Sequence, residues 1–251
     1  MSARSRALTR DGRFAAAWAT ALATGALAVA LAHTAARTLP APRPLEELAY
    51  YPSGRFIEPA TLGHAQSAAD LAWLRAVQYY GEHRDTDNHF ARMAHVFDIL
   101  TTLAPHFTAA YAFGGFALAQ EGRDFAAAER LMQKGVDANP TDADLAFEFG
   151  FLYYVKPGGR DLERAAEYFE RAARLPNPPP MAARFAAFAR QNAGELAVAY
   201  ALWADVRAHS PNRYLRDMAE REMDAIRRAW AARRLELARR HLATPGVQLV
   251  R

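Results

Sequence analysis

Residues 107–140 read FTAAYAFGGFALAQEGRDFAAAERLMQKGVDANP, two apolar stretches joined by the polar turn EGRD and closed by a proline. Similar segments lie on both sides, and their closing prolines recur about every 35 residues. In three segments a packing residue stands twelve positions before the proline: Met93 and Pro105, Ala128 and Pro140, and Ala199 and Pro211. In the fourth segment, Ala165 is followed by two prolines, Pro176 and Pro178. This period predicts a stack of helix-turn-helix units, none of which buries its apolar face alone.

The spacing of apolar and turn residues predicts four helical hairpins and an all-α fold. The expected helix pairs are 65–82 with 88–103, 107–121 with 124–138, 142–155 with 161–174, and 179–192 with 195–209. Gly and Asp between the paired helices are expected to form the turns and to cap the following helix. No β-strand pattern is evident in the sequence.

The hairpins resemble the tetratricopeptide-repeat family, which pairs small residues in both helices with aromatic residues and a closing proline. The matching residues are Tyr111, Gly115, Ala128, Met132, Gly135 and Pro140; Gly150, Tyr153, Ala165, Phe169 and Ala172; Ala187, Ala199, Trp203 and Pro211; and Gly81, Phe97 and Pro105, with Met93 in place of alanine. The small residues let two helices cross closely. The resemblance implies a right-handed solenoid of about four hairpins over residues 63–211.

The N-terminal region contains an uncharged run from Phe14 to Ala32 that follows four arginines. A hydrocarbon core needs roughly 20 apolar residues, so we expect a transmembrane anchor over 14–36 after a basic cytoplasmic tail over 1–13. The positive-inside rule then places the remainder on the far side of a bacterial inner membrane, in the periplasm. A secretory signal peptide that is cleaved near Ala30-Leu31-Ala32 is the alternative.

Two further segments flank the expected repeats. Residues 38–62 are predicted to be an extended linker, because their prolines forbid a long helix. Four apolar residues of the linker are expected to dock on the first hairpin: Tyr50, Tyr51, Phe56 and Ile57. Residues 212–242 are predicted to form one long capping helix before a tail over 243–251, with an apolar stripe at Leu215, Met218, Glu222, Ile226 and Trp230.

The basic residues gather at the two ends of the chain. The formal net charge is +4, with +4 on residues 1–37 and +5 on 213–251, which leaves −5 on 38–212. This distribution argues against a nucleic-acid-binding domain, whose basic residues would cluster on its body. Arginine pairs end the capping helix, at 227–228, 233–234 and 239–240. They either remain solvated or contact anionic lipid headgroups or an acidic partner.

The sequence offers little that indicates catalysis. The chain has no cysteine, which excludes disulfides, Cys-ligated zinc and thiol chemistry. His83, His89 and His95 recur every six residues and do not share a helical face, so no metal site is expected. The acidic pairs Glu46–Glu47 and Asp142–Asp144 fit solvated charge and helix capping. We therefore expect no enzyme, cofactor or metal.

The family resemblance implies a concave groove lined by the first helix of each hairpin. Carried over to this chain, the lining residues are Arg75, Gln78, Glu82, Phe116, Gln120, Phe147, Phe151, Tyr154, Arg184, Phe188, Gln191 and Asn192. Gln78 and Glu82 depart from the family's Lys and Asn clamp for a carboxylate. The aromatic residues instead suit an apolar helix or extended segment of a partner, unless they pack between repeats.

These features together predict a membrane-anchored protein–protein interaction scaffold, an accessory or assembly subunit of a bacterial membrane complex. Candidate complexes are an exporter, a pilus or secretion machine, and an energy-converting complex. The first alternative is a free periplasmic adaptor that is released by signal cleavage. A cryptic hydrolase or metalloprotein is the remote alternative.

Overall fold

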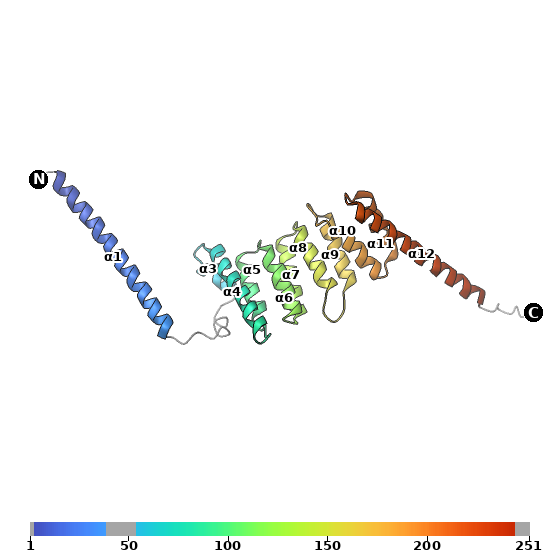
Figure 1. Ribbon diagram of the computed structural model, residues 1–251, viewed down its shortest axis with the longest axis horizontal. Coiled ribbons are helices and arrows are strands. Elements are labelled where there is room, and N and C mark those ends of the chain that lie inside the picture. The colour runs from blue at the N-terminus through green and yellow to red at the C-terminus, as the bar shows by residue number, and fades with distance from the viewer. Residues whose placement is uncertain (1–2, 39–53, 244–251) are drawn as a thin grey trace, which may run out of the picture. The chain divides into compact units, whose positions relative to one another are not determined.

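The computed structural model describes the backbone of residues 3–38 and 54–243, with side chains over 17–34 and 56–240. The predicted all-α class is confirmed, since every regular element in these ranges is a helix (Figure 1). The chain divides into two compact units, Met1–Tyr51 and Pro52–Arg251. The predicted linker residues Glu46, Glu47, Tyr50 and Tyr51 and the tail beyond Ala243 lie outside the described residues.

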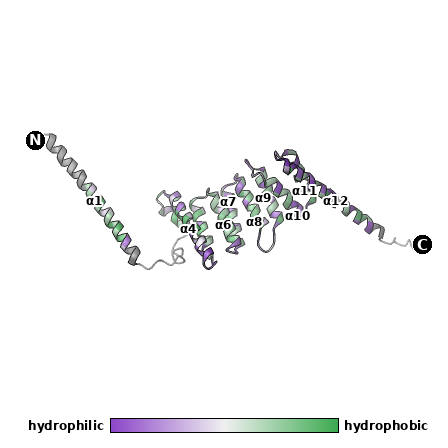
Figure 2. Ribbon diagram, in the orientation of Figure 1, coloured by the Kyte–Doolittle hydropathy of each residue, from purple (hydrophilic) through white to green (hydrophobic). Residues whose placement is uncertain are grey.

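The first unit contains one long helix, α1 (Ala3–Thr38). Within it, Ala17–Thr34 is long and apolar enough to cross a membrane, judged by length and composition. The side chains of this stretch are exposed, and Figure 2 shows apolar residues along it. The helix also includes most of residues 1–13, which were predicted as a basic tail.

The second unit is a series of short helices followed by a long one. Its helices are α3 (Gly54–Ala60), α4 (Ala65–Asp85), α5 (Met93–Leu103), α6 (Thr108–Gln120), α7 (Phe125–Ala138), α8 (Ala143–Tyr154), α9 (Leu162–Arg174), α10 (Ala182–Asn192), α11 (Leu196–His209) and α12 (Arg213–Ala243). The extensive contacts among them join helices one or two places apart in chain order, as the row in Figure 1 shows. Each predicted helix pair corresponds to an observed pair, α4–α5, α6–α7, α8–α9 and α10–α11.

The helix ends follow the local turn chemistry. Asp124, Asp142 and Asp161 each cap the next helix, accepting a backbone N–H three residues ahead at 2.9, 2.8 and 3.2 Å. The capping predicted for Asp124 and Asp142 is confirmed, and Asp161, which was predicted as the first helical residue, also acts as a cap. Helix α5 begins at Met93, five residues later than predicted, because Asn88 takes a positive φ of 53° and turns the chain.

Part of the predicted extended linker is helical. Helix α3 contains Pro59 and packs against α5, so tertiary contact offsets the hydrogen bond that the proline removes. Ile57 is half-buried, but Phe56 is 74% exposed, so the prediction that Phe56 docks on the first helix pair was wrong. In a helix these adjacent side chains point about 100° apart, and only one of them can face α5.

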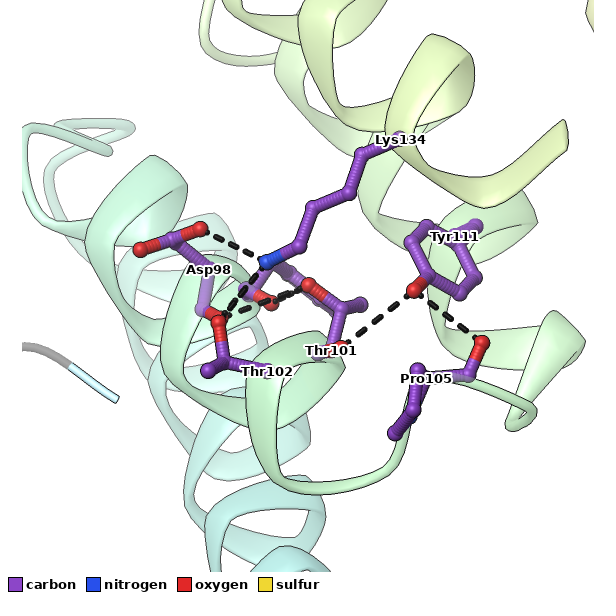
Figure 3. Close-up of polar contacts among 7 residues, drawn as sticks. Asp98, Thr101, Thr102, Pro105, Tyr111 and Lys134 are labelled. Carbon is purple, nitrogen blue, oxygen red and sulfur yellow. Dashed lines mark hydrogen bonds and ion pairs between the residues drawn. The ribbon is translucent and has the colours of Figure 1, made fainter. Parts of the chain in front are cut away.

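Polar contacts tie α5 to the two helices that follow it (Figure 3). Lys134 Nζ on α7 donates to Asp98 Oδ1 and Thr102 Oγ1, both at 2.8 Å. The Tyr111 hydroxyl on α6 shares its hydrogen between the Thr101 carbonyl of α5, at 3.3 Å, and the Pro105 carbonyl, at 3.1 Å, and burial raises the pKa of Tyr111 to about 12. The first two helix pairs are therefore joined by hydrogen bonds as well as by apolar packing.

Helix α12 packs through the first part of its length. Ala219, Met223 and Ile226 are buried against Trp203 of α11, with Leu215, Met218 and Trp230 partly buried beside them. Of the predicted stripe, Ile226 is fully buried, whereas Glu222 is half-buried at the edge. All side chains over 231–240 are exposed.

Glycines mark the closest helix crossings. A Cβ at Gly115 would lie 2.7 Å from Met132 Cγ, and one at Gly135 would lie 2.7 Å from Tyr111 Cγ. At Gly150 it would lie 3.0 Å from the Ala165 carbonyl oxygen. Gly81 differs, because nothing lies within 4 Å of its Cβ position. Its predicted role as the crossing residue of the first pair was wrong, since α4 buries a different face: Ala69, Ala76, Tyr79 and His83.

We predict that Gly150→Ala lowers the free energy of unfolding by about 1–3 kcal/mol, because its methyl group overlaps the α9 backbone and Phe169. Gly81→Ala is the matched control. Its methyl group meets open space, so better helix propensity should stabilise the protein by up to about 1 kcal/mol. Urea unfolding of both variants checks the pair, and equal midpoints would contradict the assignment of Gly150 to a crossing.

Candidate partner-binding surface

Helix α8 leaves one narrow face uncovered. Eight of its twelve residues are buried. The four that are not follow one another at helical spacing, and we call them the α8 stripe: Asp144, Glu148, Phe151 and Tyr154. Asp144 is exposed and the other three are half-buried. The stripe therefore has two carboxylates at its N-terminal end and two aromatic rings at its C-terminal end.

Aromatic residues of neighbouring helices extend the stripe sideways. The ring of Phe151 lies 6.0 Å from that of Phe116 on α6 and 6.0 Å from that of Phe185 on α10. The Tyr154 ring lies 5.7 Å from that of Phe185. All four residues are half-buried, and together they form what we call the aromatic cluster. Rings at these separations support one another while leaving part of each surface open.

Phe147 lies beneath this cluster. It is 8% exposed, and its ring packs 5.1 Å from Phe169 and 5.5 Å from Phe185. Of the three aromatic residues predicted on this helix, Phe151 and Tyr154 thus remain partly open and Phe147 is interior. The sequence left open whether these aromatic residues line the groove or pack between helices, and Phe147 packs between helices.

Glu148 is a half-buried carboxylate without a counter-charge. It makes no hydrogen bond or ion pair with any residue that the structure describes, and the same is true of Asp144 one turn away. Burial, and secondly the charge of Asp144, raise the pKa of Glu148. Other half-buried carboxylates on the described helices have partners, as in Glu170 with Arg190 at 2.7 Å and Glu129 with Arg164 at 2.5 Å.

The predicted residues of α10 have structural partners. Gln191 Oε1 accepts from Trp203 Nε1 at 2.7 Å, and Gln191 Nε2 donates to Glu222 at 2.8 Å, which links α10 to α11 and α12. The ring of Phe188 meets Trp203 edge-on at 4.9 Å. Asn192 is exposed and donates to the Phe188 carbonyl. This part of the predicted groove joins the final helices together.

Arg184 occupies a different setting on the same helix. Its guanidinium lies 5.2 Å from the Phe185 ring centre, and its buried Nε has no hydrogen-bond partner among the described residues. It lines a cavity of about 210 Å³ bounded by Pro178, Pro179 and Pro180. Arg184 therefore remains a candidate contact at the edge of the aromatic cluster.

The predicted groove residues of the first helix pair are not aromatic, and none of them contributes a ring to the aromatic cluster. Arg75, Gln78 and Glu82 are exposed on α4. Trp73 and Tyr80 instead meet α6, with ring centres 5.6 and 5.2 Å from that of Phe113. Of the predicted residues on α6, Phe116 belongs to the cluster, and Gln120 is exposed and donates to the Val155 carbonyl at 3.4 Å.

Two residues of this surface were missed by the sequence prediction. Phe151 lies 35 residues after Phe116, and Phe185 lies 34 residues after Phe151, so the repeat period could have identified Phe185. Glu148 stands two residues before Gly150, as Phe113 stands two residues before Gly115. The sequence therefore shows a carboxylate at the position where the preceding hairpin has a phenylalanine, and this difference could have identified Glu148 as a candidate site residue.

The loops before α5 and α7 enclose a second, more polar hollow. This cleft of about 620 Å³ includes His89, Phe90, Gln120, Glu121 and Arg123 among its lining residues. Beside it, His83 Nδ1 lies 2.6 Å from Asp87 Oδ1, and this contact lowers the pKa of Asp87. Within the described ranges, no three His, Asp or Glu side chains are grouped to hold a metal ion.

The chain matches no protein-family model, no curated protein and no solved structure in the three comparisons. Its function is therefore inferred from its own residues.

We predict that Phe147→Ala and Phe151→Ala differ in their effect on stability. Removing the buried Phe147 ring should lower the free energy of unfolding by about 3–5 kcal/mol. Removing the half-buried Phe151 ring should lower it by about 1–2 kcal/mol. Denaturant unfolding measures both values, and a larger loss for Phe151 would show that its ring is core rather than surface.

Proposed function

We propose that this protein is a membrane-anchored protein–protein interaction scaffold, an accessory or assembly subunit of a bacterial membrane complex. The observation that carries the proposal is the aromatic cluster, which stays partly open across α6, α8 and α10. Aromatic residues that remain accessible on a rigid surface are enriched among the residues that dominate binding energy. A surface of this kind suits an apolar segment of a partner.

The proposal includes a tetratricopeptide-like, right-handed solenoid built from the four helix pairs. Contacts between near neighbours in chain order support it, as do the glycines at the α6–α7 and α8–α9 crossings. Repeat proteins of this architecture have an extended surface and usually bind partners along it.

The anchor in the proposal is helix α1. Its apolar stretch Ala17–Thr34 suits a membrane span by length and composition. Arg4, Arg6, Arg10 and Arg13 precede the stretch, and the positive-inside rule favours keeping them in the cytoplasm. The helix pairs would then lie on the periplasmic side. A released periplasmic adaptor is the alternative, and mass spectrometry of the mature N-terminus separates the two.

The end of α12 offers a second contact in the proposal. Residues 227–240 contain six arginines and one glutamate, and the side chains over 231–240 are exposed. Such a helix end would be attracted to anionic lipid headgroups or to an acidic face of the same membrane complex.

We expect Phe151→Ala to reduce partner capture by roughly 30-fold, because a central aromatic contact contributes about 2 kcal/mol to binding. The measurement is a gentle-detergent pull-down of the full-length protein from native membranes, with quantification of the proteins that co-purify. Tyr214→Ala is the matched control, since Tyr214 is 60% exposed on α12, away from the cluster. Unchanged capture by a folded Phe151→Ala protein would remove the cluster as the binding surface.

We also expect the C-terminus to lie outside the cytoplasm, because the four N-terminal arginines resist translocation. An alkaline phosphatase domain, which is active only after export, should be active when fused after Arg251. Fluorescence from a cytoplasm-only reporter at the same position would reverse the assigned topology.

A further inference from the structure

We infer that the α8 stripe recognises a lysine or arginine side chain carried by an apolar helical segment of the partner. The inference rests on the proposed function and specifies the chemistry of its partner. Asp144 and Glu148 are two carboxylates with no partner among the described residues; they lie one helical turn apart, and the aromatic cluster begins one turn further on.

Like charges four residues apart on a helix destabilise it slightly, and no described cation compensates Asp144 and Glu148. The other half-buried carboxylates on the described helices have partners, such as Glu129, whose Oε1 accepts from the Tyr153 hydroxyl at 2.6 Å and also pairs with Arg164. The carboxylates of the stripe are therefore the groups on this helix that a cation from outside would compensate.

Glu148 is half-buried, so its carboxylate has lost part of its hydration in the unbound protein. A partner cation would restore the lost interaction, and a partly desolvated ion pair is stronger than an exposed one. Phe116 and Phe151 lie on either side of the α6–α8 contact, and aromatic faces attract cations.

The two ends of the α8 stripe differ in their charged neighbours. At its far end, Arg160 lies 4.9 Å from the ring centre of Tyr154. The α8 stripe thus runs from negative charge to aromatic surface over about 15 Å of helix, and a positive charge lies beside its aromatic end. A partner helix of two to three turns matches this length. Its cation would contact Asp144 and Glu148, and its apolar side chains would contact Phe151.

Charge complementarity selects this occupant over the others. An anionic membrane surface would be repelled by the two carboxylates. An uncharged apolar segment would bury Glu148 further without compensating it, which carries an energetic penalty. A second copy of the chain could supply the same combination of cationic and apolar side chains, because the arginine-rich end of its α12 includes the exposed Leu235 and Leu237.

The test uses three synthetic 15-residue Ala/Leu helical peptides that differ at one position of the apolar face, which is Lys, Glu or norleucine. Their affinity for the full-length protein in lipid nanodiscs is measured by fluorescence anisotropy, with empty nanodiscs subtracted. We expect the Lys peptide to bind about tenfold more tightly than the other two. Glu148→Gln should remove this preference, and Glu148→Lys should shift it to the Glu peptide.

Glu129→Gln is the matched control, because Glu129 is also a half-buried carboxylate but has protein partners. It should leave the peptide preference unchanged. Thermal unfolding supplies a second readout. A carboxyl whose pKa is raised in the folded state destabilises the fold above that pKa, and the effect disappears as the pH falls below it. At pH 7.5 Glu148→Gln should therefore raise Tm, whereas Glu129→Gln should lower it.

Each of the following outcomes would overturn the inference. Equal affinity for the three peptides, or no binding of any of them, would remove the cation preference. A lower Tm for Glu148→Gln would show that Glu148 stabilises the fold. Salt-sensitive self-association of the full-length protein that Glu148→Lys abolishes would assign the stripe to a second copy. If native capture depends on Phe151 but not on Glu148, the proposed function stands and the cation inference fails.

Discussion

The close approach of paired helices at glycine is the constraint on which the second unit depends. At Gly115 and Gly150 the helices pass so closely that even a methyl group would overlap the opposite helix. At Gly135 the glycine is on the second helix of the pair, α7, and the ring of Tyr111 on α6 fills the space that its side chain would occupy. These contacts set the distance between α6 and α7 and between α8 and α9. Helices held this close bury most of their surface with alanine and a few large side chains.

Burial on this scale determines what remains for recognition. Because α8 is covered by its neighbours on most sides, its uncovered face is a single stripe rather than a broad polar surface. The rings of Phe151 and Tyr154 pack against Phe147 and Phe185, so neighbouring side chains position them in the unbound chain. A preorganised surface loses little side-chain entropy on binding.

The final helices are joined by a different kind of contact. Gln191 bridges Trp203 and Glu222, and Arg190 bridges Glu170 and Glu195 at 2.7 and 2.9 Å. These polar links are partly buried and join α9 to α12 in sequence. Buried polar networks that are fully satisfied specify one arrangement of the elements that they connect. Glu148 contrasts with them, because its charge is unsatisfied within the described chain, and that contrast marks it as a group available to a partner.

The sequence by itself determined the helix pairs, because the proline period, the glycine positions and the Asp caps are local signals that are read within one or two turns. It also indicated Phe116, Phe151 and Tyr154, since residues three and four apart share a helix face. Only the tertiary structure decided that Phe147 is interior, that Ala76 rather than Gly81 faces the core, and that Gln191 is occupied by Trp203 and Glu222. Periodicity states which residues lie on one face of a helix. Whether that face is covered depends on how neighbouring helices are rotated and spaced, and those quantities are set by residues about 30 or more positions away.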